Sequence, residues 1–144
     1  MTEVDVSADI EIAAAPADVA AVMFDPARES EWMQTVKSVE VIDPALAPGA
    51  RVRHTGNFLG KEISWTTTVE TIQFPHVLTL TIAEGPFTGT VSYTIARTAT
   101  GARARIRNIG QTTKLGLLPA AIVERPMRSA LLEDLERLKK IIER

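Results

Sequence analysis

Hydrophobic and polar residues alternate with a period of two along most of this chain of 144 residues. Between residues 4 and 12, for example, apolar side chains occupy the even positions and polar side chains the odd ones. This alternation is typical of β-strands that bury one face and expose the other, as antiparallel sheets permit. The pattern recurs in residues 51–58, 62–70, 77–83, 87–95 and 102–110. It loses phase near residues 70–75, which predicts a β-bulge there.

Two helical stretches interrupt this pattern near the beginning of the chain. Pro16 suits the first position of a helix, and Asp18 lies in the first turn, where a negative charge is favourable. Asp25 has a side chain that commonly caps a helix, and Pro26 follows it as a first helical residue. We therefore expect two short helices between the first and second strands.

A third and much longer helix is expected from about Leu117 to Glu143. At 1.5 Å per residue it extends about 40 Å, enough to cross a sheet. Its apolar stripe consists of Met127, Leu131, Leu135, Leu138 and Ile142. Burying five such side chains contributes about 7–15 kcal/mol, comparable with the net stability of a domain, so this helix should cover the sheet. Pro126 predicts a kink in it or the start of a second helical segment.

The inward face of the predicted sheet carries residues that a dry core disfavours. These are His54, Trp65, Thr67, Tyr93 and Asn108, together with Gly56, Gly89 and Gly110. An unpaired polar group costs about 1–3 kcal/mol when buried, and an inward glycine fills no volume. The polar groups must therefore bond to one another, lie near the rim or face a cavity. We expect a cavity between the sheet and the long helix, with Trp32 and Met33 closing one end.

Composition and charge narrow the class of protein. The chain has no cysteine and a formal net charge of −2. It therefore has neither disulfides nor thiolate metal sites, and no general attraction to nucleic acid or anionic membranes. The first residues lack the basic and apolar segments of a signal peptide, and no stretch contains the roughly 18 apolar residues of a membrane span. We expect one cytoplasmic domain, residues 1–144.

Three arginines at alternate positions, Arg103, Arg105 and Arg107, raise the question of nucleic-acid binding. They fall on the outer face of the last strand, and acidic residues at positions 5, 9 and 11 fall on the outer face of the first. We expect these strands to be neighbours joined by cross-strand ion pairs, with no binding of nucleic acid. We also expect neither cofactor nor metal, since no cofactor motif is present and the two histidines lie about 20 residues apart.

The order of the predicted elements resembles the helix-grip domains of the START and Bet v 1-like superfamily (SRPBCC). Residues 25–43, DPARESEWMQTVKSVEVID, are similar to the helix-to-strand segment of its polyketide cyclase/dehydrase-like branch. The resemblance covers nearly the whole chain and implies an α+β fold, in which a curved seven-stranded antiparallel sheet wraps around the long C-terminal helix. It also implies a deep apolar cavity that holds lipids, sterols, polyketides or other hydrophobic molecules. Superfamily members include enzymes and carriers and share no catalytic motif.

The leading hypothesis is that the chain binds a hydrophobic or aromatic small molecule, lipid-like or polyketide-like, in that cavity. The alternative is a polyketide cyclase or dehydratase-like enzyme in which His54 or Tyr93 transfers protons, since imidazole titrates near neutral pH. We expect the protein to be a monomer or a homodimer. The residues expected to contact the ligand are Trp32, His54, Phe58, Trp65, Tyr93, Asn108, Met127 and Leu131.

Several of these polar residues also have a purely structural interpretation. His54 has no carboxylate next to it in the sequence, so it could be a hydrogen-bonded residue of the cavity wall. Tyr93 and Asn108 could bond to each other across neighbouring strands. Glu124 and Arg128 have the spacing of an exposed ion pair on the long helix.

Overall fold

The computed structural model describes residues 2–58, 60–112 and 119–144. Over these residues the chain forms seven strands, three α-helices and one short 3₁₀-helix. In chain order the elements are β1 (Thr2–Ile12), α1 (Pro16–Met23), η1 (Pro26–Arg28), α2 (Glu29–Trp32), β2 (Val36–Val41), β3 (Arg51–Phe58), β4 (Lys61–Gln73), β5 (Val77–Ile82), β6 (Phe87–Thr98), β7 (Gly101–Thr112) and α3 (Ala120–Ile142).

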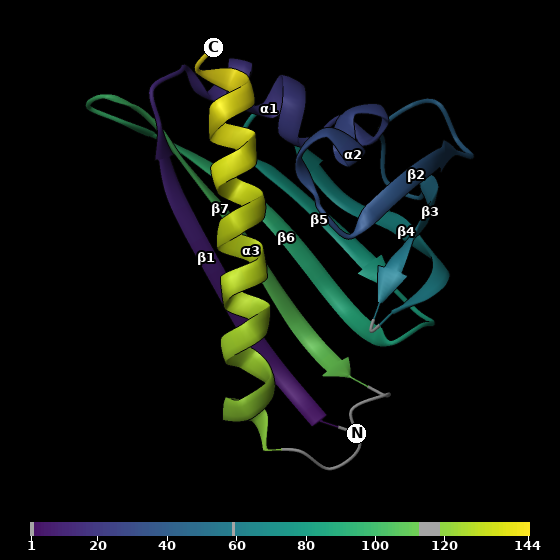
Figure 1. Ribbon diagram of the computed structural model, residues 1–144. Helices are drawn as coiled ribbons and strands as arrows, with labels where there is room; N and C mark the ends of the chain where they lie inside the picture. Colours follow the sequence, from purple (N-terminus) through teal and green to yellow (C-terminus); the bar gives the residue numbers. More distant parts are fainter. Residues whose placement is uncertain (1, 59, 113–118) are drawn as a thin grey trace.

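The strands form one antiparallel sheet in the order β1-β7-β6-β5-β4-β3-β2. Figure 1 shows that the sheet curves and that α3 lies across its concave face beside β1, with α1 and α2 near the C-terminal end of α3. The predicted helix-grip fold is therefore confirmed. The predicted bulge is also present, because the pairing of β4 with β5 shifts register between Val69 and Thr71.

The first and last strands are neighbours, as the alternating charges predicted. Arg107 pairs with Asp5 at 2.7 Å, and Arg103 pairs with Asp9 at 3.1 Å. Glu11 differs from the expectation, because it accepts hydrogen bonds from the hydroxyls of Thr98 and Thr100 at the turn between β6 and β7. The arginine stripe is thus largely paired within the sheet.

The long helix begins at Ala120 as the structure describes it, and residues 117 and 118 of the predicted helix lie outside the described residues. Pro126 lies inside one continuous helix, so the alternative of a second helical segment is wrong. The proline removes the donor that would bond the carbonyl of Ile122. Ile122 is exposed, so water can satisfy that carbonyl.

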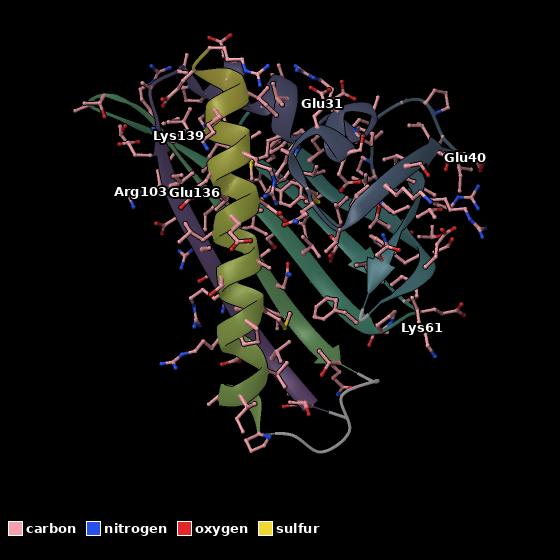
Figure 2. All side chains as sticks on the ribbon, in the orientation of Figure 1. Glu31, Glu40, Lys61, Arg103, Glu136 and Lys139 are labelled. Atoms are coloured by element: carbon pink, nitrogen blue, oxygen red, sulfur yellow. The ribbon has the colours of Figure 1, made fainter. Side chains whose placement is uncertain are left out.

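Side chains of α3 protect the open edge of β1. Glu124 accepts a hydrogen bond from the backbone N–H of Asp5 at 2.9 Å. Lys139, labelled in Figure 2, donates to the carbonyl of Glu11 at 2.9 Å. The predicted pair of Glu124 with Arg128 is absent among the described residues. The prediction considered partners within the helix only, whereas an edge strand presents unpaired backbone groups that these side chains can satisfy.

The inward glycines have a different role from the one expected. A Cβ atom at Gly56 would lie 2.0 Å from the carbonyl oxygen of Thr35, and one at Gly110 would lie 2.0 Å from that of Thr88. These positions therefore let backbone segments approach closely. They do not by themselves leave empty space beneath the helix.

Candidate functional site

A cavity of about 250 Å³ lies between the sheet and α3, and we call it the helix cavity. Its apolar wall is built from both layers: the strands contribute Trp65, Phe87 and Val91, and the helix contributes Met127 and Leu131. The side chains of β4, β6 and β7 that reach it are those that the alternation places inward. Asn108 on β7 and Asp134 on α3 also line it.

The helix cavity opens to solvent on the side where the chain enters β2. Three of its lining residues are exposed, namely Thr35 before β2, Asn57 near the end of β3 and Ala130 on α3. A small molecule therefore has a route from solvent to the apolar wall. Of the eight residues predicted to contact a ligand, four line this cavity: Trp65, Asn108, Met127 and Leu131.

The structure places Trp32 in the core instead of in the wall of the helix cavity. It is fully buried and packs edge-on against Tyr93, with ring centroids 6.1 Å apart and planes at 64°. Arg137 of α3 donates a hydrogen bond to its carbonyl at 3.0 Å. Trp32 therefore anchors α2 between the sheet and α3. The side chain of Phe58 lies outside the described residues.

His54 is the centre of a buried polar cluster. Its Nδ1 lies 2.5 Å from Oε2 of Glu29, and its Nε2 lies 2.8 Å from Oγ1 of Thr67. The side chains of His54 and Glu29 are only 3% and 11% exposed. The imidazole also stacks on Trp65, with ring centroids 5.3 Å apart and planes at 7°. We call Glu29, His54 and Thr67 the histidine cluster.

Glu29 is the functional candidate that the sequence analysis missed. It lies 25 residues before His54 and belongs to a different element, so adjacency in the sequence did not reveal the pair. The signal was its spacing from Trp32. Residues three apart share one face of a helix, so burying Trp32 also buries Glu29.

The atoms of the histidine cluster follow the order hydroxyl, imidazole, carboxylate, which is also the order in serine hydrolases. The void beside the cluster has a volume of only about 20 Å³, and Tyr93 and Leu78 also line it. Such a volume accommodates about one water molecule. The structure therefore leaves no space for an acyl substrate at the hydroxyl of Thr67.

Tyr93 is buried beside this void. Burial raises the pKa of its phenol well above the usual value, and the nearby carboxylates of Glu29 and Asp134 raise it further. Tyr93 therefore stays protonated, so it can donate a hydrogen bond but cannot act as a base near neutral pH. The proposed bond between Tyr93 and Asn108 is absent among the described residues, where Asn108 Oδ1 has no partner.

No three acidic or histidine side chains in residues 2–58, 60–112 and 119–144 lie close enough together to hold a metal ion. Within the same parts of the chain, no helix has both the length and the apolarity needed to cross a membrane.

Comparison with known proteins relates this geometry to a family. The family model described as "Polyketide cyclase / dehydrase and lipid transport" matches residues 3–143. No curated protein matches the chain.

Solved structures share the fold at low sequence identity. The protein TTHA0849 from Thermus thermophilus is 22% identical, covers 96% of both chains and has a TM-score of 0.80. DR_A0006 from Deinococcus radiodurans is 20% identical over 94% of this chain and 95% of its own, with a TM-score of 0.70. Ara h 8.0201 is 14% identical over 96% of both chains, with a TM-score of 0.68. At these identities the similarity shows the fold.

Proposed function

Because the chain belongs to the polyketide cyclase/dehydrase and lipid transport family, we propose that it binds a compact apolar or aromatic molecule in the helix cavity. The observation that carries this proposal is the space beneath α3, whose wall is formed by side chains such as Trp65, Val91, Met127 and Leu131. Small-molecule sites are typically concave and mostly apolar, with a few placed polar groups.

The volume of the helix cavity limits the size of the ligand. An apolar cavity of about 150 Å³ accommodates benzene, and drug-sized ligands occupy pockets of about 300–1,000 Å³. The helix cavity, at about 250 Å³, lies between these limits. It fits a molecule of one or two rings better than a sterol or a long acyl chain.

The test is calorimetric titration of the protein with naphthalene, a two-ring molecule without polar groups. We expect one molecule to bind per chain. Leu131→Trp fills the cavity and should weaken binding at least tenfold. Leu132→Trp is the matched control, because the neighbouring Leu132 is 39% exposed and does not line the cavity. Absence of binding, or equal binding by the two variants, would contradict the proposal.

A second candidate function is proton transfer by the pair of Glu29 and His54, as in a cyclase or dehydratase. The buried contact between their side chains favours it, because a carboxylate in contact with an imidazole can orient that ring for proton transfer. Against it, both ring nitrogens of His54 are engaged and Trp65 covers one ring face. If His54 is catalytic, His54→Gln will abolish product formation from a polyketide substrate while naphthalene binding is retained.

A further inference from the structure

The helix cavity has an uneven distribution of charge. Among the described residues that line the cavity, Asp134 has the one ionisable side chain. No lysine, arginine or histidine is among them. The other polar group deep in the wall is the side-chain amide of Asn108. The wall therefore offers hydrogen-bond acceptors and a negative charge to a ligand, without a cation to receive an anion.

Asp134 uses only one of its two carboxylate oxygens within the protein. Oδ1 accepts a hydrogen bond from the backbone N–H of Gln34 at 3.2 Å and another from Nη2 of Arg137. Among the described residues Oδ2 has no partner. A carboxylate that is 11% exposed and lines a cavity therefore keeps one oxygen available to a ligand donor.

Arg137 does not cancel this charge on the cavity side. Its side chain is 34% exposed, and its Nε donates to the carbonyl of Trp32 outside the helix cavity. Arg137 does not line the cavity, whereas Asp134 does. A ligand in the cavity therefore contacts the carboxylate of Asp134 and not the guanidinium of Arg137.

Asn108 presents a second unsatisfied acceptor from the opposite layer. Its Oδ1 is buried without a hydrogen-bond partner among the described residues. It comes from β7 in the floor of the cavity, whereas Asp134 comes from α3 above it. A buried polar atom without a partner favours any ligand group that can bond to it.

We propose that Asp134 and Asn108 make the helix cavity selective for small aromatic molecules that are neutral or cationic and carry a hydrogen-bond donor, and that Asp134 rejects carboxylates. The proposal rests on the proposed function, since it assigns the ligand class of the same cavity. Selectivity of this kind arises as much from an unfavourable charge contact with the wrong ligand as from bonds to the right one. Fatty acids and other anionic lipids are thereby disfavoured.

The test is a matched series of naphthyl ligands measured by calorimetry at pH 8: naphthalene, 2-naphthol, 2-naphthylmethylammonium and 2-naphthoate. We expect the naphthol and the ammonium to bind at least tenfold more tightly than naphthalene, and the naphthoate at least tenfold more weakly. Because all four share one ring system, differences report on the polar group.

Three variants assign the effect to residues. Asp134→Asn keeps an oxygen that accepts from the backbone N–H of Gln34 and removes the charge. The affinity for naphthoate should therefore rise at least tenfold, and the ammonium should no longer bind more tightly than naphthalene. Asn108→Leu should reduce the affinity for 2-naphthol to that for naphthalene. Glu133→Gln, an equal charge change at an exposed neighbour on α3, should alter none of the four affinities.

The outcomes separate this inference from the proposed function. If naphthalene binds but naphthoate binds equally well, or if Asp134→Asn leaves naphthoate unchanged, the inference is wrong and the binding function stands. If naphthalene does not bind, the proposed function itself is wrong. The wild-type series decides the charge preference even if a variant fails to fold.

Discussion

Replacing Glu29 with alanine should lower the free energy of unfolding by about 2–4 kcal/mol. A hydrogen bond to a charged group contributes about 1.5–3 kcal/mol, and a buried polar group left without its partner costs about 1–3 kcal/mol. The contact with His54 is 2.5 Å long, and its two side chains are 11% and 3% exposed, so bulk solvent does not compete with it. The imidazole keeps its bond to Thr67, which moderates the cost.

A second substitution at the same position separates charge from shape. Glu29→Gln keeps the length of the side chain and an oxygen that can accept from Nδ1 of His54. A neutral hydrogen bond contributes about 0.5–1.5 kcal/mol. The free energy of unfolding of the glutamine variant should therefore fall by about 1–2 kcal/mol, less than that of the alanine variant.

Glu31→Ala provides the matched control. Glu31 lies two residues later in the same short helix and pairs with Arg28 at 3.0 Å, but the side chains are 45% and 38% exposed (Figure 2). Ion pairs in this environment contribute little to stability. Urea unfolding followed by tryptophan fluorescence measures all three variants. If Glu29→Ala unfolds at the same urea concentration as Glu31→Ala, the buried pair does not stabilise the fold and the reasoning fails.

Two further predictions concern α3. Leu135 is fully buried, whereas Leu132 is 39% exposed. Leu135→Ala should therefore lower the free energy of unfolding, measured with urea, by about 2–5 kcal/mol, and Leu132→Ala should lower it by less than about 1 kcal/mol. Equal losses would mean that the stripe does not face the sheet. Burial raises the pKa of Asp134 in the folded protein, so the stability linked to this carboxyl is present at low pH and is lost as the pH rises through the raised pKa. Asp134→Asn should therefore gain stability relative to the wild type over that pH range, and a gain confined to lower pH would refute the assignment.

The sheet was predictable because each strand has one buried and one exposed face, so its residues alternate. The same reasoning placed Trp65 and Asn108 inward and identified the neighbours β1 and β7 through their opposite charges. The apolar spacing on α3 likewise predicted which side chains face the sheet. These features depend on local periodicity and on composition, which a single sequence carries.

The partners of individual side chains were not predictable in the same way. Alternation assigns His54 to a face, but its contact with Glu29 depends on how η1 and α2 pack against the sheet. The partner of Glu124 similarly depends on the position of α3 beside the edge of β1. The division of the interior into a void of about 20 Å³ and a cavity of about 250 Å³ depends on side-chain packing, which no period in the sequence records.

Trp65 connects the two halves of the interior. Its indole lies against the imidazole of His54 and also lines the helix cavity. Hydrogen bonds from α2 and β4 hold that imidazole at both nitrogens, so the indole rests on a fixed ring. A wall that is already ordered loses less side-chain entropy when a ligand packs against it. The histidine cluster therefore favours ligand binding because it fixes the position of Trp65 in the cavity wall. This role requires no free nitrogen on His54.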